Sequence, residues 1–347
     1  MKSKNLSEKI LSSVKSKGFK YIELPSVIEA NHIVQRSGEN FRKFMFSFTD
    51  INGKELCLRP DLTIASCLRY LENNLKGKEK IFYSGQAYRK VQSKKDKIIR
   101  NQVGFEILGS KDEKKDDKEI INTSIKILQD LKFSSGTLTI GNIEIFNLLI
   151  SKLDIPKRWK LRLSRHFWRE EYFNDLLKRL ETNADIDPTI VEIDKRRYLD
   201  LLNKNPETMI AGRSVGEILK RFDTKIKDPR QAKRGNKVSK IIKSFLKISC
   251  PINKAAMELN KFFKKNKINL VVDQRYFPIS SNKLSKLNVK FSTSFGRHLE
   301  YYSGMVFKID VKSKSASIKC AGGRYDRLIS DLGSKKQVPA VGAAFNL

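Results

Sequence analysis

The sequence has few histidines and cysteines and no long apolar run. Its three histidines include no pair at metal-ligand spacing and its four cysteines form no CxxC pair, so we expect no metal site, and nothing in the sequence predicts a cofactor. No apolar run approaches the ~18 residues of a membrane-spanning helix, and residues 1–20 lack the continuous apolar stretch of a signal peptide. We therefore expect a cytoplasmic protein without membrane contact, whose thiols are reduced.

Acidic residues are scarce relative to basic ones. Seventy Lys or Arg against 38 Asp or Glu give a net charge of +32, an excess that is typical of nucleic-acid-binding proteins. The lysines are nevertheless spread along the whole chain, and neither arginine-rich base readers nor aromatic stacking platforms are evident. We favour a compositional origin, in a genome whose adenine and thymine content favours lysine codons, and expect no nucleic-acid partner. Residues 220–247, with eleven Lys or Arg against two Asp, form the one candidate patch.

Strand and helix patterns alternate over the first 141 residues. The predicted elements are a helix over 6–17 that ends at Gly18, strands over 44–50 and 55–58, a helix over 62–75, strands over 80–88 and 98–108, a helix over 120–131 and a strand over 137–140. The dipeptide Asn52-Gly53 predicts a tight hairpin turn with two positive φ angles. The charged residues 110–119 are typical of solvated surface.

Helical periodicity replaces the strand pattern from residue 142 to about 260, with breaks near four prolines. Strands return at 269–273, 302–311 and 315–319. This order predicts an α+β fold, in which an antiparallel sheet flanked by helices is interrupted by a helical insert.

Four segments carry residue types that suit ligand binding. The first, LRPDLT at 58–63, places the carboxylate of Asp61 and the hydroxyl of Thr63 at the start of a helix. Both residue types also favour the N-terminal cap of a helix, which is the alternative interpretation.

The second segment spans two strands, 82–89 and 101–106. By the two-residue period, Gln102 and Glu106 share one face with a glycine between them, which suits the floor of a small-molecule site. Arg89 can hold an anionic group in a forked geometry. The alternative is a solvated sheet face.

The third segment, FGRHLEYYSG at 295–304, sets Arg297 before Tyr301 and Tyr302, a pattern that suits the binding of a carboxylate and the packing of a ring. The fourth, AGGRYD at 321–326, leads from a strand into a helix through two glycines that permit close approach of the backbone to a ligand. An ordinary turn is the alternative for each.

In this order and at these separations, the four segments resemble the class II aminoacyl-tRNA synthetase core of the histidyl-tRNA synthetases, over about 1–140 and 265–347. Pro25 resembles the proline of that class's first motif, which lies at a dimer interface. The other matches are 88–89 and 102–106 with the second motif, 322–326 and 338–342 with the approach to the third, and 297–302 with the histidine-specific signature.

Departures from the synthetase pattern favour a paralogue. The arginine that ends the third motif and contacts ATP would lie beyond Leu347, no anticodon-binding domain is expected, and the loop 90–97 lacks the ATP-facing pattern. Residues 37–61 and 211–218 are more similar to the paralogous family that regulates ATP phosphoribosyltransferase in organisms with a short catalytic subunit.

The resemblance implies a synthetase-like core in two parts, 1–141 and 261–347, with a helical insert at 142–260. It implies that the chain is no enzyme by itself but serves the first step of histidine biosynthesis. Its partner would be the short-form catalytic subunit of ATP phosphoribosyltransferase, its effector histidine, and its assembly a homodimer within a hetero-oligomer. The alternatives are a minimal histidyl-tRNA synthetase without its anticodon-binding domain and an RNA-binding module built on a synthetase fold.

The resemblance also implies a histidine-binding pocket without catalytic residues. Its members are Asp61, Thr63, Arg89, Gln102, Glu106, Arg297, Tyr301, Tyr302 and Tyr325. The α-amino group would meet Asp61, Thr63 and Gln102. The imidazole would meet Glu106 and Tyr302, the carboxylate would meet Arg297, and Tyr325 would close one wall.

Overall fold

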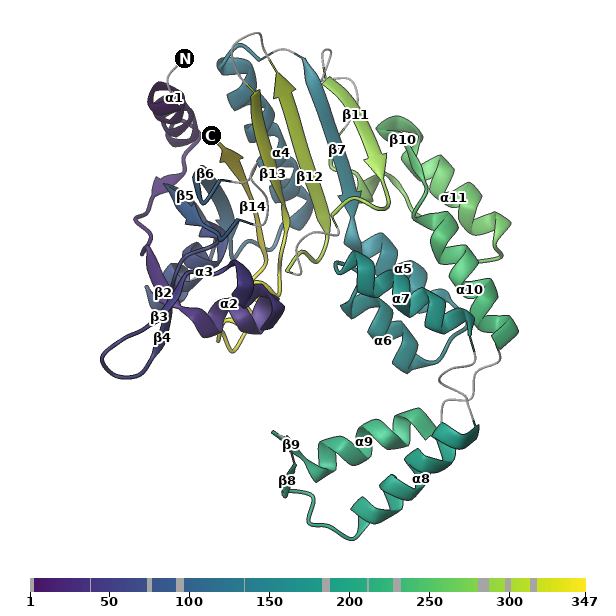
Figure 1. Ribbon diagram of the computed structural model, residues 1–347. Helices are drawn as coiled ribbons and strands as arrows, with labels where there is room; N and C mark the ends of the chain where they lie inside the picture. Colours follow the sequence, from purple (N-terminus) through teal and green to yellow (C-terminus); the bar gives the residue numbers. More distant parts are fainter. Residues whose placement is uncertain are drawn as a thin grey trace. The chain divides into compact units, whose positions relative to one another are not determined.

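The chain folds into two compact units (Figure 1). The computed structural model describes residues 3–37, 39–73, 77–91, 97–133, 135–182, 188–210, 212–226, 232–279, 287–296, 301–312 and 317–347. The sheet unit comprises Met1–Glu144, Ser249–Leu259 and Val272–Leu347, and the helical unit comprises Ile145–Ile248 and Asn260–Val271. The helical unit thus returns for a short second stretch after residue 259, where the sequence predicted a single insert over 142–260.

A nine-stranded sheet forms the centre of the sheet unit. Its strands, in spatial order, are β1 (Lys20–Tyr21), β5 (Glu79–Tyr88), β6 (Ile99–Leu108), β14 (Ala340–Asn346), β13 (Ser317–Arg324), β12 (Met305–Lys312), β7 (Gly136–Asn142), β11 (Leu287–Ser292) and β10 (Ser249–Pro251). Neighbours are antiparallel except β1 with β5 and β7 with β11. This mainly antiparallel sheet with its helices confirms the predicted α+β class, and it brings β6 beside β14 from the far end of the sequence.

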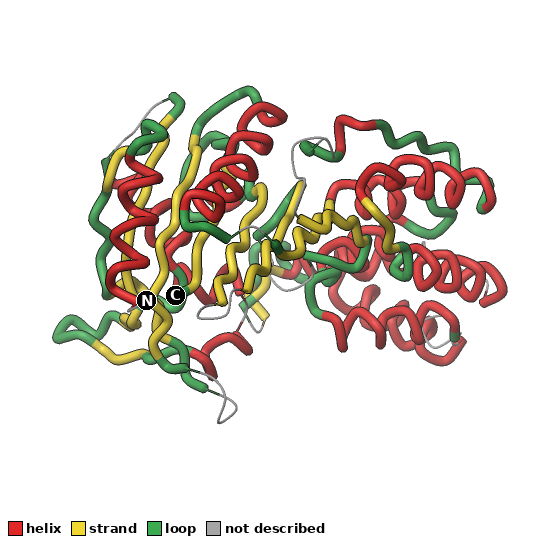
Figure 2. The backbone as a smooth tube through the Cα atoms, turned by 90° about the horizontal axis from the view of Figure 1, so that it is seen from above, coloured by secondary structure: helices red, strands yellow, loops and turns green. Residues whose placement is uncertain are grey.

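Helices flank this sheet (Figure 2). The helices α1 (Ser3–Lys15) and α4 (Glu113–Asp130) contact each other and β6, and α3 (Leu62–Glu72) contacts β5 and β6. Phe105 of β6 packs edge-on against Phe19, which follows α1, at 5.4 Å between ring centroids, whereas its neighbour Glu106 accepts a hydrogen bond from Thr63 of α3. Since successive side chains of a strand point to opposite faces, α1 and α3 cover opposite sides of β6.

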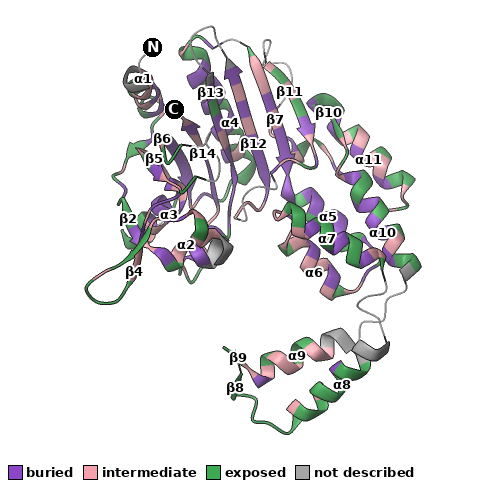
Figure 3. Ribbon diagram, viewed as in Figure 1, coloured by how far each residue is buried: buried purple, intermediate pink, exposed green. Residues whose placement is uncertain are grey.

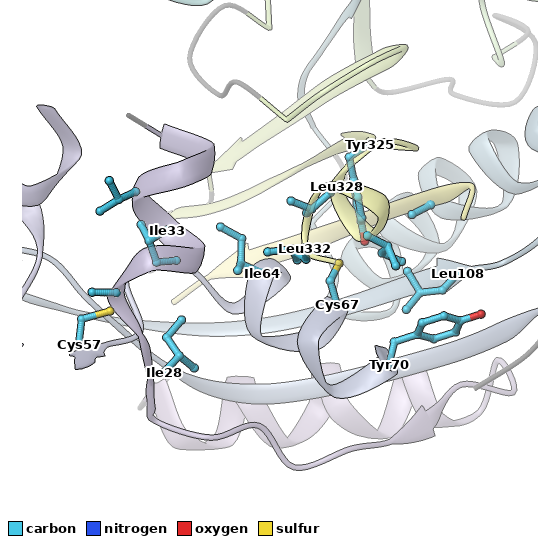
Figure 4. Packing of buried hydrophobic residues seen from close by; sticks show 14 of the residues in the cluster. Ile28, Ile33, Cys57, Ile64, Cys67, Tyr70, Leu108, Tyr325, Leu328 and Leu332 are labelled. Carbon is cyan, nitrogen blue, oxygen red and sulfur yellow. The ribbon is translucent and has the colours of Figure 1, made fainter. Parts of the chain in front are cut away.

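A hydrophobic cluster anchors α3 to the sheet unit (Figure 4). Ile64 and Cys67 of α3 are buried against Leu328 of the short helix α12 (Leu328–Asp331) and against Tyr325, which precedes it. Full burial of a large apolar side chain stabilises a fold by roughly 1.5–3 kcal/mol. The strands at the centre of the sheet are likewise mostly buried (Figure 3). The position of α3, and with it the polar groups at its start, is therefore fixed by apolar packing.

A three-stranded sheet in the order β2 (Val27–Glu29), β4 (Glu55–Leu58), β3 (Ser47–Thr49) accompanies α2 (Ala30–Ser37) and the 3₁₀ helix η1 (Glu39–Phe44). The predicted hairpin exists, but the prediction of a tight two-residue turn is wrong. The fully described loop from Asp50 to Lys54 has a positive φ, 77°, at Gly53 alone. The Asp50 carboxylate accepts backbone N–H bonds from Asn52 at 2.9 Å and from Lys54 at 2.8 Å, which stabilises the longer loop.

Other predicted elements differ in extent. The helix expected over 120–131 begins at Glu113, within the charge run that was expected to be solvated surface. No strand forms at 269–273, where Val271 is 75% exposed and lacks a partner strand. The strands β11 and β14 were not predicted. The sequence of β14, AVGAAFN, is rich in small residues and lacks the β-branched alternation that marks a strand.

Part of the helical unit packs round an aromatic core. Its helices are α5 (Ile143–Lys152), α6 (Lys157–Arg165), α7 (Glu170–Glu181), α8 (Pro188–Leu202), α9 (Val215–Ile226), α10 (Ala232–Phe245) and part of α11 (Ala255–Lys265), with the short pair β8 (Met209–Ile210) and β9 (Arg213–Ser214). Phe146 stacks on Phe167 at 3.8 Å and meets Phe173 edge-on at 5.8 Å. Such pairs stabilise a core beyond the area they bury.

The remaining short elements are the 3₁₀ helices η2 (Ile252–Lys254) and η3 (Gln274–Tyr276). All four cysteines carry free thiols, and three of them are buried. In the part of the chain that the structure describes, every helix is too short or too polar to cross a membrane.

Candidate functional site

The sheet unit contains a cavity of about 190 Å³ between β6, β13, β14 and the start of α3. It is lined by Asp61, Thr63, Ala87, Arg89, Arg100, Gln102, Glu106, Tyr301, Tyr302, Ala321, Gly322, Tyr325, Gly342, Ala343, Ala344 and Asn346. Eight of the nine residues that the sequence singled out thus lie round one cavity. The ninth, Arg297, lies outside the described residues.

Glu106 is the most deeply buried charged group of the cavity, with 1% of its surface exposed. Its carboxylate accepts hydrogen bonds from the hydroxyls of Tyr83 at 2.5 Å, Tyr325 at 2.6 Å and Thr63 at 3.3 Å. Burial raises the pKa of Glu106 to about 7, against the opposing effect of these donors. The group is therefore held by neutral hydroxyls and carries no paired cation among the described residues.

Two glycines make room for this arrangement. A Cβ on Gly342, which lies opposite Glu106 in the pairing of β14 with β6, would stand 1.2 Å from Glu106 Oε2. A Cβ on Gly104 would stand 2.4 Å from the ring of Tyr83. Real side chains cannot approach so closely, so both positions require glycine for the carboxylate and its phenol donor to stay where they are.

The tyrosines form a second wall. Tyr301 and Tyr302, just before β12, meet edge-on at 4.9 Å, and Tyr301 meets Tyr325 at 5.8 Å. Burial raises the pKa of all three phenols above the usual range, so they stay neutral and can donate or accept a hydrogen bond. An aromatic wall that faces a buried acid suits a planar ring bearing N–H groups.

The sequence left two roles open for Asp61, ligand binding and the N-terminal cap of a helix. Its Oδ1 accepts the backbone N–H of Ile64 at 3.0 Å and so caps α3, while its Oδ2 lies 3.9 Å from the Arg89 guanidinium. Arg89 also donates from Nε to the Pro60 carbonyl at 2.8 Å and lies over the Phe41 ring at 5.7 Å. Cap and ligand binding are compatible, because a carboxylate accepts several hydrogen bonds.

Arg59 supports the site from outside the cavity. It is buried, and it donates to the carbonyls of Gln86 at 2.9 Å, Leu24 at 2.6 Å and Pro25 at 2.8 Å. Burial lowers the pKa of Arg59. A Cβ on Gly85 would stand 2.3 Å from its Nη2. Arg59 thus ties the segment of Pro25 to β5 through backbone contacts alone.

Arg324, in the fourth segment, does not reach the cavity. Its Nε donates to Asp117 at 2.8 Å, its Nη1 to Asp326 at 2.8 Å and its Nη2 to the Glu113 carbonyl at 2.9 Å. The guanidinium is 4% exposed. Asp117 belongs to the charge run expected to be solvated, and burial raises its pKa to about 6 while Arg324 opposes the rise. This buried network joins β13 to α4 and is structural.

Sequence reasoning missed several lining residues. Arg100 lies two residues before Gln102 on β6, so the alternation that identified Gln102 and Glu106 would have identified it as well. Asn346 accepts a hydrogen bond from the Gln102 side chain at 2.7 Å. It comes from β14, 244 residues away along the chain, and no local sequence pattern predicts that pairing.

A second hollow lies wholly in the helical unit. It measures about 750 Å³ and is lined by Glu181, Lys233, Asn236, Lys237, Lys240, Ile241, Ser244, Lys265, Asn266 and Lys267. Its lysines come from the candidate basic patch and from the end of α11, and all of them are exposed. Exposed lysines on flexible stems make a basic surface rather than a preorganised site.

The cavity of the sheet unit suits a small polar molecule. It is lined by a buried acceptor, neutral phenols, two amides and two guanidinium groups. Such a set can bind a ligand with N–H donors at one end and an anionic group at the other.

Comparisons with known proteins show the family to which the chain belongs. A family model described as histidyl-tRNA synthetase matches residues 1–228 and 224–347. A protein of Agrobacterium fabrum named ATP phosphoribosyltransferase regulatory subunit is 28% identical over 92% of this chain and 89% of its own length. A protein of the same name from Allorhizobium ampelinum is 28% identical over 96% of this chain and 93% of its own length.

Solved structures share the fold. A structure from Bacillus halodurans C, described as an ATP phosphoribosyltransferase regulatory subunit/histidyl-tRNA synthetase, matches with a TM-score of 0.57 and 21% identity, over 99% of this chain and 76% of that chain. A histidyl-tRNA synthetase from Nostoc sp. PCC 7120 matches with a TM-score of 0.59 and 16% identity, over 98% of this chain and 68% of that one. The synthetase-like core expected from the sequence is confirmed.

Proposed function

Because the chain belongs to the histidyl-tRNA synthetase family, we propose that it acts as the regulatory subunit of ATP phosphoribosyltransferase and that its cavity binds histidine as the effector. The proposal for the role rests on relatives of that name, which match this chain over nearly its whole length. In this role the chain is not an enzyme by itself. It activates a short-form catalytic subunit, which joins ATP to phosphoribosyl pyrophosphate in the cytoplasm, and it works as a homodimer within a hetero-oligomer.

The observation that supports histidine as the ligand is the buried carboxyl of Glu106, which lies among tyrosine side chains. An imidazole N–H can donate to this carboxyl, and Tyr302 lines the same cavity. A buried carboxylate gains a charge-assisted bond from an imidazolium, and either protonation state of the ring provides a donor. The α-amino group would lie near Asp61 and Gln102.

Histidine binding would couple to the partner subunit through differential affinity. An effector that binds two states of the assembly equally shifts nothing, so histidine must favour one state over the other. The subunit contacts are proposed to include the Pro25 segment, which Arg59 holds against β5.

The test is reconstitution with a short-form catalytic subunit. The two proteins should co-purify, phosphoribosyl-ATP formation should depend on this chain, and histidine should inhibit it while phenylalanine at the same concentration should not. A catalytic subunit that is fully active and insensitive to histidine in the presence of this chain would contradict the proposal.

A second candidate is histidine activation by a minimal synthetase. The cavity supports it, because the same residues would bind histidine as a substrate. Histidine-dependent exchange of pyrophosphate into ATP distinguishes the two. The regulatory role predicts exchange at background, and robust exchange would favour the synthetase.

A further inference from the structure

Two amide side chains that lie far apart in the sequence meet in the wall of the cavity. Asn346 of β14 lies directly opposite Gln102 of β6 in the register of the two strands, so their side chains leave the sheet on the same face, with Cβ atoms roughly 5 Å apart. Gln102 donates from Nε2 to Asn346 Oδ1 at 2.7 Å. Both residues line the cavity and both are half-buried. The hydrogen bond therefore joins two groups of the cavity wall.

This hydrogen bond decides which edge of the Gln102 amide is left for a ligand. A planar amide carries donors on its nitrogen edge and an acceptor on its oxygen edge. In a free side chain the two edges can exchange places, because the terminal torsion is broad and roughly two-fold. Asn346 occupies the nitrogen edge, so the carbonyl oxygen of Gln102 is left to accept from a ligand. A carbonyl oxygen suits an ammonium group, whereas an N–H edge would disfavour it.

Small side chains separate the amide pair from the Glu106 carboxyl. Glu106 follows Gln102 on the same face of β6, and Ala344, with Ala321 opposite it on β13, lines the cavity between these two polar ends. The ends are roughly 13 Å apart along the strand, of which two hydrogen bonds of about 2.8 Å each occupy roughly 6 Å. The remaining length, roughly 7 Å, suits histidine from its ring nitrogen to its α-amino nitrogen.

We infer that Asn346 is a positioning residue, which holds the carbonyl oxygen of Gln102 toward the α-ammonium group of the ligand and so lets the site select amino acids over analogues without that group. The inference rests on the proposed histidine binding and adds to it a residue that acts through another. A hydrogen bond from a charged donor is stronger than one between neutral groups. Without Asn346, the Gln102 amide would present its N–H edge to the ligand for part of the time, and the preference would fall.

Calorimetry with histidine and with imidazolepropionate, which is histidine without its α-amino group, tests the inference. The parent protein should bind histidine more tightly. Asn346→Leu keeps the approximate size of the side chain but offers no acceptor. It should reduce the preference roughly threefold to tenfold and leave the affinity for imidazolepropionate unchanged. Asn346→Asp offers acceptors only, so the Gln102 nitrogen must still face it, and the preference should be retained.

A double-mutant cycle shows whether Asn346 acts through Gln102. In a Gln102→Leu background the amide is absent, and Asn346→Leu should then leave the remaining preference unchanged. An equal loss of preference in both backgrounds would mean that Asn346 contacts the ligand by itself. A loss of affinity for both ligands would mean that its role is merely structural. Either result would overturn the inference.

Asn266→Leu is the matched control. It removes a half-buried amide of the helical unit that donates to the Phe262 carbonyl at 2.8 Å, and it should change neither affinity. If Asn346→Leu keeps the preference of the parent, or if the parent binds the two ligands equally, the inference is overturned while histidine binding stands. If the parent binds no histidine, the proposed function and the inference are both overturned.

Discussion

Two buried charged centres lie in the sheet unit, and they differ in how completely they are paired. At the Arg324 centre, every nitrogen of the guanidinium donates to Asp117, Asp326 or a carbonyl. At the Glu106 centre, the carboxyl accepts hydrogen bonds only from neutral hydroxyls among the described residues, and burial raises its pKa to about 7. Burial raises the pKa of Asp117 as well, to about 6, although Arg324 opposes the rise.

The difference distinguishes a structural centre from a candidate binding centre. Removal of a charge from water costs several kcal/mol unless an opposite charge and further hydrogen bonds compensate. At the Arg324 centre, the protein's own carboxylates and a carbonyl compensate the cost of burying the guanidinium, so no ligand is needed there. The Glu106 centre is compensated in part, and it opens onto a cavity from which a ligand can supply the missing donor.

Loss of Arg324 should have the largest effect on stability. Arg324→Ala leaves Asp117 and Asp326 buried without their cation, and we expect the unfolding free energy in urea to fall by about 3–5 kcal/mol. Adding Asp117→Asn should recover part of this loss. Histidine affinity of the folded variant should change little. Unaltered stability, or selective loss of histidine binding, would show that this centre is not structural.

The Glu106 centre should make stability depend on pH. The ordinary pKa of the group is 4.5 and its value in the fold is about 7, so between these values the folded state binds more protons than the unfolded state. The unfolding free energy should therefore fall as the pH rises from 4.5 to 7, by about 3 kcal/mol, and stay level above that range.

Glu106→Gln isolates this contribution, since an amide does not titrate. Urea unfolding of both proteins between pH 4.5 and 8 should give a steeper decline for the parent, while the groups common to both cancel. Parallel curves would mean that Glu106 titrates near its ordinary value and that the burial argument fails.

Gly342→Ala tests whether stability and histidine binding depend on the position of the Glu106 carboxyl. The added methyl group would stand 1.2 Å from Glu106 Oε2, so the carboxyl must leave its tyrosine donors. We expect a stability loss of about 1–3 kcal/mol and loss of histidine binding in calorimetry. Gly216→Ala is the matched control, because its Cβ would meet nothing nearer than 3.5 Å. Normal histidine affinity in Gly342→Ala would separate the ligand site from Glu106.

Thr63→Val should have the smallest effect. It removes the longest of the three bonds to Glu106, 3.3 Å, with little change in shape. We expect a stability loss of about 1 kcal/mol or less and a higher pKa of Glu106, since this hydroxyl lowers it. Thr182→Val, an exposed threonine that bonds the Arg179 carbonyl, should leave the Glu106 titration unchanged. A larger loss than that of Gly342→Ala would contradict the proposed ranking of the contacts.

Local patterns predicted part of the candidate binding centre and failed for the structural one. Alternation along β6 placed Gln102 and Glu106 on one face, and the cap signal placed Asp61 and Thr63 at the start of a helix, as the structure has them. These features depend on neighbours in sequence.

The rest depends on partners far apart in the chain. The need for glycine at position 342 arises from the pairing of β14 with β6, and the burial of Asp117 arises from Arg324, 207 residues away. A run of charged residues looks the same whether it faces water or a buried arginine. The Arg324 centre therefore appears only once the sheet is assembled.

Hydrogen exchange with and without saturating histidine tests whether histidine binds at the Glu106 centre. We expect slower exchange of backbone amides in residues 59–66 and 301–305, which border the cavity, and no change in the helical unit. Protection confined to residues 232–245 of the helical unit, or no protection anywhere in the chain, would contradict histidine binding at the Glu106 centre.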